Sequence, residues 1–294
     1  MQLVLRCSIG LFLFEGESAV RRTITCKAKA ILTAAWSSDS KVKGRAIYYH
    51  SVDPTGSRSH HPDQFRAQLR WLRKNGWRDL LAREVPELLS GGGLERRVCI
   101  TFDDGYRDNL EFALPILIEE GFRATFFVVA GMVMEKPKSS NLGNMLYKGR
   151  SMLSKGDLRV LAAAGMEVAS HGWSHRQATE LMHMEGFAAL VEDLQRARES
   201  LTDIVGEKIV SYAYPNGQLG ARSANTARAV QVAGYEVCAS THWGGLLNNH
   251  PLELNRCEMA SDDSIVEFSA KMSGDCDWRG LVNRFIDRSG VWYK

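Results

Sequence analysis

Residues 96–105 read RRVCITFDDG, an apolar run that ends in two adjacent carboxylates and a glycine. A second run, ATFFVVA at 124–130, is apolar throughout, as in strands that a parallel sheet buries on both faces. Between them, Leu110, Leu114 and Leu117 recur at helical spacing. The strand, helix and strand in this order predict a parallel sheet with helices outside it.

The same alternation continues in both directions from this centre. Four further strands are expected in AIYYHSV (46–52), MEVAS (166–170), KIVSYAY (208–214) and YEVCAS (235–240). Helices are expected from His61-Pro62-Asp63 onward, after Ser154, across 186–206 and across 224–233. The sequence therefore predicts one α/β domain over 45–294, preceded by a poorly ordered N-terminal extension at 1–44. A length of 294 residues suits a single α/β barrel.

The composition is that of a globular protein, with 45% hydrophobic and 24% charged residues. Lys and Arg number 37 and Asp and Glu 34, a balance that does not favour nucleic-acid binding. The apolar runs at 8–14 and 30–36 are too short to span a bilayer, so no transmembrane segment is predicted. The 6 cysteines are scattered and predict no disulfide framework.

Asp103 and Asp104 follow the first quoted strand directly. Two carboxylates crowded at the end of an apolar strand are costly unless a cation or a proton neutralises one of them. An Asp-Gly turn that merely closes the strand is the alternative. The pair alone leaves both interpretations open.

A second polar segment, SHGWSH at 170–175, also follows a predicted strand. His171 and His175 are four residues apart, a spacing that can bring two imidazoles to one side of a turn for metal binding. Active sites of α/β barrels lie at the carboxyl ends of the strands. One Asp and two His predict a divalent metal site, with zinc favoured and cobalt or nickel as alternatives. The remaining carboxylate would act as general base on a water that the metal activates.

Together these segments resemble the polysaccharide deacetylase family, carbohydrate esterase family 4. The resemblance rests on YYHSV, ITFDDGYRDN, ALPIL, ATFFV, SHGWSH and YPNG, and spans roughly residues 45–260. The sequence is most similar to the branch with an N-terminal "YH" strand and a "YPxG" third motif. The resemblance implies a distorted (β/α)7 barrel that hydrolyses N-acetyl groups on a GlcNAc-containing poly- or oligosaccharide and releases acetate.

The resemblance also implies a role for each matching residue. It places the catalytic base at Asp103 and the metal ligands at Asp104, His171 and His175. In the third motif it places the backbone N–H that binds the oxyanion at Asn216. A backbone donor tolerates a change of side chain, so Asn at this position is compatible with the role.

The sequence departs from the family pattern in three places. The second residue of the histidine motif is Gly172 instead of Ser or Thr, which predicts the loss of one hydrogen bond around the ligands. The Arg that orients the base in the third motif is replaced by Ala213. The Asp that partners this Arg is not recognisable in residues 240–243. We hypothesise that Arg256 supplies the missing positive charge.

The family's general acid is a His at the end of a C-terminal strand, but no His follows His250. The strand IYYH at 47–50 has the same form at the beginning of the domain. His50 is therefore the predicted acid of a permuted barrel, unless it only closes its strand. His242 is the alternative acid.

Aromatic residues on the presumed site loops are predicted to contact the sugar: Tyr106, Trp173, Tyr214 and Trp243. His60 and His61 are expected in an exposed loop or at the start of a helix.

Three functions remain compatible with the sequence. The first is N-deacetylation of a glycan, the second is hydrolysis of O-acetyl esters or of a non-sugar amide at the same site, and the third is carbohydrate binding without catalysis. An N-acetylated glycan is the predicted partner. The glycan itself, the native metal and the oligomeric state are left open. The lack of a clear signal sequence favours the cytoplasm over the cell envelope or secretion, without deciding between them.

Overall fold

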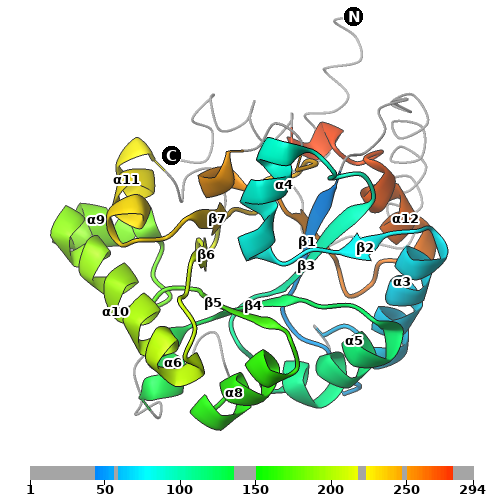
Figure 1. The fold of residues 1–294 in the computed structure, drawn as a ribbon, viewed down its shortest axis with the longest axis horizontal. Coiled ribbons are helices and arrows are strands. Elements are labelled where there is room, and N and C mark those ends of the chain that lie inside the picture. Colours follow the sequence, from blue (N-terminus) through cyan, green and yellow to red (C-terminus); the bar gives the residue numbers. More distant parts are fainter. Residues whose placement is uncertain (1–43, 56–58, 136–149, 218–222, 247–249, 281–294) are drawn as a thin grey trace, which may run out of the picture. The chain divides into compact units, whose positions relative to one another are not determined.

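Within the described residues, seven parallel strands curl into a barrel in the order β7-β6-β5-β4-β3-β1-β8, and β2 pairs with β3 beside this path. Helices surround the strands (Figure 1). The predicted distorted (β/α)7 barrel is confirmed. The computed structural model describes residues 44–55, 59–135, 150–217, 223–246 and 250–280. The extension predicted for 1–44 lies outside these residues, apart from Gly44.

The elements have the following bounds. The strands are β1 (Arg45–Tyr49), β2 (Arg78–Asp79), β3 (Arg97–Phe102), β4 (Thr125–Val128), β5 (Glu167–Ser170), β6 (Ser211–Ala213), β7 (Val237–Ala239) and β8 (Cys257–Glu258). The α-helices are α3 (Pro62–Lys74), α4 (Val85–Gly91), α5 (Leu114–Glu120), α6 (Ala130–Met134), α8 (Lys155–Ala163), α9 (Ala178–Glu185), α10 (Phe187–Val205), α11 (Ala224–Val232) and α12 (Ile265–Ser273).

Side chains alternate between two apolar clusters along the central strands, as the pleat requires. On β3, Val98, Ile100 and Phe102 belong to the cluster that includes the buried residues of the helices. Cys99 belongs to the other cluster, to which the neighbouring strands contribute mainly small side chains such as Ala46. This second cluster lies on the inner face of the curled sheet, where small side chains allow the sheet to curl tightly. Both faces of β3 are therefore buried, which is why its sequence is apolar without alternation.

The segment after β7 closes the barrel. Leu254 pairs in parallel with Ala239 of β7, while Cys257 and Glu258 pair in parallel with Ile47 and Tyr48 of β1. β1 also pairs with β3 along its whole length. The first strand of the domain therefore lies between β3 and the last strand, so the loop after β1 reaches the same end of the barrel as the loop after β3.

Helix boundaries follow the local signals in the sequence. The His61 side chain accepts a hydrogen bond from the Asp63 N–H at the start of α3. Ser154 and Asp157 form the expected capping box of α8. Gly206 ends α10 in the left-handed conformation. Pro115 lies in the first turn of α5, directly after a π-helical turn at Asn109–Ala113 that accommodates a residue unable to donate a backbone hydrogen bond.

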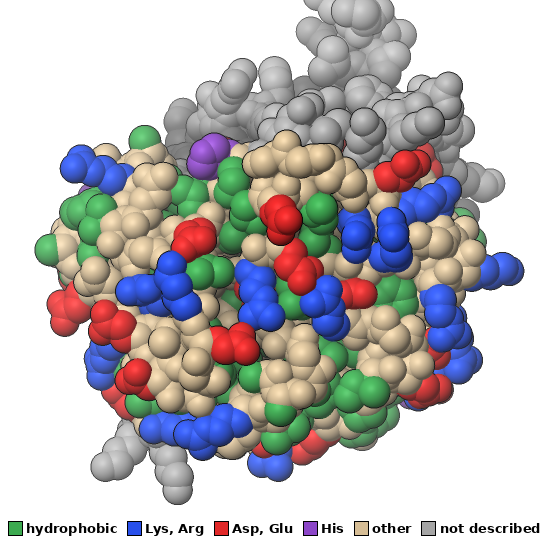
Figure 2. All heavy atoms as spheres, in the orientation of Figure 1, with side chains coloured by type: hydrophobic (Ala, Val, Ile, Leu, Met, Phe, Trp, Pro, Cys, Tyr) green, Lys and Arg blue, Asp and Glu red, His purple; other side chains and the backbone are tan. Residues whose placement is uncertain are grey.

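Charged side chains of both signs are interspersed on the face drawn in Figure 2. Ion pairs between helices and loops show the same mixing, for example Arg123 with Asp79 at 2.6 Å and with Glu84 at 2.9 Å. In the part of the chain that the structure describes, no helix has both the length and the apolar character needed to cross a membrane.

Candidate active site

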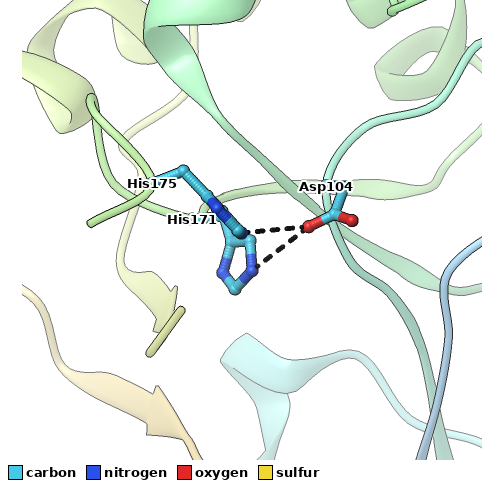
Figure 3. Close-up of side chains that lie close together, drawn as sticks. All are labelled: Asp104, His171 and His175. Carbon is cyan, nitrogen blue, oxygen red and sulfur yellow. Dashed lines mark ion pairs between the residues drawn. The ribbon is translucent and has the colours of Figure 1, made fainter. Parts of the chain in front are cut away.

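Asp104, His171 and His175 come together at the carboxyl ends of β3 and β5 (Figure 3). Their candidate ligand atoms all lie within 4.8 Å of one another. Asp104 Oδ1 is 3.2 Å from His175 Nε2 and 3.6 Å from His171 Nε2. Ligands about 2.1 Å from a tetrahedral zinc ion lie about 3.4 Å apart, and the two distances from Asp104 to the histidines are close to this value.

A hydrogen bond fixes how His171 presents its ring. Its Nδ1 lies 2.9 Å from the carbonyl oxygen of Ala213, which can only accept, so Nδ1 carries the proton. Nε2 then directs a lone pair toward Asp104. Burial lowers the pKa of His171 to about 4, against the opposing effect of the Asp103 charge. The imidazole is therefore neutral near pH 7, as metal ligation requires.

Asp104 is ionised in this setting. Burial opposes ionisation, but the hydrogen bond from His175 and the electrostatic interactions with His171 and His175 hold the pKa of the Asp104 carboxyl well below its usual range. A carboxylate and two imidazoles form a donor set that suits a divalent ion.

The backbone at the site is strained. Within the described residues, four non-glycine residues have a left-handed φ, and three of them are predicted site residues: Asp104 (74°), His175 (58°) and Asn216 (53°). Left-handed φ costs energy at any residue with a Cβ and persists only where the surroundings impose it. Gly105 follows with φ 81°, and a Cβ there would lie 3.0 Å from Val128 Cγ1, which explains the glycine of the DDG motif.

Asp103 is held by Arg256. Arg256 Nη1 donates to Asp103 Oδ1 at 2.6 Å, and Nη2 donates to Oδ2 at 2.8 Å. Both side chains are buried, with Arg256 0% and Asp103 3% exposed. The guanidinium also donates to the Ser240 carbonyl oxygen at 2.9 Å and to Thr101 Oγ1 at 3.0 Å. The positive charge hypothesised for Arg256 does lie against the predicted base.

This ion pair keeps the base ionised. Burial alone would raise the pKa of the Asp103 carboxyl, but Arg256 overrides it and holds that pKa below its usual value. The same pairing raises the pKa of Arg256 despite its burial. Asp103 is therefore a carboxylate near neutral pH.

The two candidate acids occupy different surroundings. His50 is exposed, directly after β1, and its charge helps to lower the pKa of both Asp103 and Asp104, so it lies near the two carboxylates. His242 is half-buried, and its carbonyl oxygen accepts from the Arg256 N–H at 2.9 Å. His50 stays the predicted acid, and His242 stays the alternative.

Asn216 lies in an exposed turn after β6. Gly217 N–H donates to the Tyr214 carbonyl oxygen at 3.1 Å and closes this turn. Among the described residues, the Asn216 N–H has no acceptor. This turn therefore offers a backbone donor, as the oxyanion role requires.

The four aromatic residues predicted to contact substrate differ in their surroundings. Tyr106 is buried and hydrogen-bonded to Asp104, which together with burial raises its pKa. Tyr214 is 1% exposed and packs against Tyr212, so its side chain has no free surface for a sugar and that prediction is not supported. The Arg196 guanidinium lies 3.5 Å from the ring centroid of Trp173.

Trp243 has a similar cationic neighbour. The guanidinium of Arg279 lies 4.7 Å from the Trp243 ring centroid, and Lys271 Nζ lies 5.4 Å from it. One face of each tryptophan is thus occupied by the protein itself, and stacking on a sugar stays a prediction for Trp173 and Trp243.

His60 contradicts its predicted exposure. Its side chain is 4% exposed and packs edge-on against Tyr49, whereas His61 is exposed and caps α3 as expected. The interpretation was wrong because a bridge between Val52 and His60 turns this segment back onto β1.

A model of the polysaccharide deacetylase family matches residues 91–238. The chain belongs to this family. The matched range contains the DDG, histidine and YPNG segments of the site. Members of the polysaccharide deacetylase family are metal-dependent enzymes, and the cluster of Asp104, His171 and His175 gives this chain a site for the metal.

Curated relatives of this polysaccharide deacetylase include YxkH of Bacillus subtilis, which is 24% identical over 233 residues, covering 78% of this chain and 76% of YxkH. The poly-beta-1,6-N-acetyl-D-glucosamine N-deacetylase of Staphylococcus aureus is 29% identical over 161 residues. That match covers 52% of each protein, so the chain spans about half the length of the staphylococcal enzyme.

Solved structures share the fold. The Streptococcus pyogenes deacetylase PplD in complex with acetate superposes with a TM-score of 0.66 at 21% identity, over 79% of this chain and 99% of PplD. IcaB from Ammonifex degensii superposes with a TM-score of 0.65 at 21% identity, over 79% and 96% of the two chains. At this identity the likeness establishes the barrel alone.

In this polysaccharide deacetylase, one contact of the loop between His171 and His175 was not predicted from the sequence. The carboxylate of Asp193 on α10 accepts hydrogen bonds from the backbone N–H groups of Trp173 and Ser174. Nothing in the sequence links an Asp in the first half of an amphipathic helix to a loop 20 residues earlier. Only the packing of α10 beside β5 reveals the contact.

Proposed function

We propose that this chain hydrolyses N-acetyl groups on a GlcNAc-containing poly- or oligosaccharide, with a divalent ion, zinc by preference, held by Asp104, His171 and His175. The observation that carries the proposal is that Asp103, paired with the buried Arg256, directly precedes Asp104, one of three candidate ligands that lie within 4.8 Å of one another. We assign the activity to residues 45–294.

The donor set supports zinc over the harder ions. Two imidazoles and one carboxylate are borderline ligands, whereas magnesium and calcium favour oxygen donors. Three protein ligands leave a position open, as in catalytic zinc sites, where structural sites have four. When bound, the ion would polarise the acetyl carbonyl and lower the pKa of a water molecule.

Asp103 is the proposed general base. It would take a proton from the water whose oxygen forms a bond to the acetyl carbon. Its carboxylate already carries two hydrogen bonds from Arg256, which keep it ionised and fix its plane. We therefore assign Arg256 as a positioning residue, in place of the Arg that the third motif lacks.

Asn216 and His50 complete the proposed set. The backbone N–H of Asn216 would donate to the carbonyl oxygen as negative charge develops on it. When the carbon–nitrogen bond breaks, the amine needs a proton to leave, and His50 would supply it. The products are acetate and a free amino sugar.

The substrate class is supported by a relative. The staphylococcal enzyme acts, by its name, on an N-acetylglucosamine polymer. Family membership together with the site geometry favours the same class of bond here. It also favours an active enzyme over a binding protein, because the chain has a candidate for the base, for each metal ligand and for the oxyanion donor.

The proposal is tested by acetate release from N-acetylglucosamine oligomers. The protein is stripped of metal with a chelator and reloaded with zinc, cobalt or nickel, beside an Asp103→Asn variant that is nearly the same size. We expect release that requires metal, is highest with zinc or cobalt, and falls by at least about 10²-fold in the variant.

Two results would contradict the proposal. Release only from O-acetylated sugars would identify an esterase. Zinc binding without release from either class of substrate would identify a carbohydrate-binding relative.

A further inference from the structure

The loop between the two metal-binding histidines has nearly all of its backbone groups bonded from outside. Asp193 Oδ2 accepts from the Trp173 N–H at 2.9 Å, and Oδ1 accepts from the Ser174 N–H at 3.1 Å. The Gly172 N–H donates to Ser170 Oγ at 3.2 Å. All three N–H groups between His171 and His175 therefore have acceptors, and one carboxylate supplies two of them.

Two carbonyl oxygens of the same loop accept hydrogen bonds from another helix, α6. The N–H groups of Ala130 and Gly131, at the start of α6, donate to the carbonyl oxygens of Gly172 at 3.0 Å and Trp173 at 3.1 Å. Arg196, one turn after Asp193 on α10, covers the ring of Trp173. The loop is thus fixed between two helices, which is what a left-handed His175 needs in order to persist.

Because residue 172 is a glycine, the Asp193 carboxylate can approach the backbone of the 171–175 loop. A Cβ on Gly172 would lie 3.2 Å from Asp193 Oδ2, tighter than ordinary contact, and Gly172 has a left-handed φ of 81°. The glycine that stands where the family usually has Ser or Thr therefore removes a hydroxyl but leaves room for a carboxylate from another helix.

We infer that Asp193 is a positioning residue, which holds the 171–175 loop in the conformation that aims both imidazoles at the metal. In this chain it takes over the support that a hydroxyl at position 172 would give. The inference rests on the proposed metal site but not on the substrate or on the assignment of the acid and the base.

The first test compares the wild-type protein with Asp193→Asn and with the control Asp203→Asn, which changes an exposed Asp on the same helix. An amide has one acceptor oxygen, so Asp193→Asn loses one of the two bonds and its charge. We expect zinc affinity, measured by competition with a chromogenic chelator, to fall about 10-fold or more in Asp193→Asn and to stay unchanged in the control.

Two further measurements separate positioning from a general loss of structure. In the metal-free protein, amide hydrogen exchange should accelerate at Trp173 and Ser174 but not in the β3 strand. At saturating zinc, kcat of Asp193→Asn should recover toward the wild-type value with KM unchanged. Equal zinc affinity in wild type and Asp193→Asn would overturn the inference.

A double-mutant cycle tests whether Gly172 and Asp193 act together. Gly172→Ala should weaken zinc binding by displacing the carboxylate and straining φ. In the Asp193→Ala background its effect should shrink, because the displaced group is gone. Additive effects would show that Gly172 and Asp193 do not act together. If the wild-type protein itself bound no zinc, the proposed function would fail, and the exchange rates would still decide whether Asp193 holds the loop.

Discussion

Two parallel hydrogen bonds, of 2.6 and 2.8 Å, join the Arg256 guanidinium to the Asp103 carboxylate across 153 residues of sequence. The pair is buried against the rings of Tyr48 and Phe127, whose centroids lie 4.9 and 5.2 Å from the guanidinium carbon. A buried charge that loses its partner is costly, so each member depends on the other.

Removing the positive charge should damage both stability and activity. We expect Arg256→Met to lower the free energy of unfolding by about 3–5 kcal/mol, because it leaves a buried carboxylate unpaired. Burial would then dominate the pKa of Asp103 and raise it. Since a base works only when ionised, the acidic limb of kcat/KM should move to higher pH.

The matched control for that variant removes both charges. Asp103→Asn combined with Arg256→Met should recover much of the lost stability in urea unfolding while remaining inactive. An unshifted acidic limb in Arg256→Met would show that Arg256 does not act through the base.

The general acid can be identified by two substitutions. We expect His50→Ala to lower kcat for an N-acetyl substrate by about 10²-fold or more, since an amine needs a proton to leave. Its effect on an acetyl ester should be smaller, because an alkoxide leaves more readily. His242→Ala should change kcat much less. The reverse ranking would move the acid to His242.

The oxyanion donor at Asn216 is proposed to be its backbone N–H. Asn216→Gly keeps this group and suits φ 53°, so kcat should be retained. Asn216→Ala should lower stability by about 1 kcal/mol, because alanine adopts left-handed φ less readily than asparagine. Chemical denaturation and acetate release measure the two effects. Loss of kcat in a folded Asn216→Gly would implicate the side chain instead.

Buried His60 should make the protein less stable in acid. Burial lowers its folded-state pKa from 6.5 to about 4. As pH falls through this window the unfolded chain binds a proton that the folded protein does not, so stability decreases, by up to about 3 kcal/mol. We expect His60→Phe to flatten this slope in urea unfolding between pH 4 and 6.5, whereas the exposed His183→Asn should not. An unchanged slope in His60→Phe would assign it to other groups.

Much of the fold and the clustering of Asp104, His171 and His175 could be predicted from the sequence. Continuous apolar runs marked β3 and β4 because both faces of a parallel strand are buried. Polar residues directly after β3 and β5 were expected at the same rim of the barrel, because parallel strands all end there. Capping residues such as Ser154 fixed helix starts within a residue or two. All of these signals are local.

The contacts that complete the site come from the tertiary structure. Arg256 reaches Asp103 because β8 closes the barrel beside β1, and Asp193 reaches the histidine loop because α10 packs along β5. The burial of His60 against Tyr49 and of Tyr214 against Tyr212 likewise depends on which elements the fold brings together. Sequence patterns report which side of an element is buried, whereas the partner of a buried polar group depends on which distant elements the closed barrel brings together.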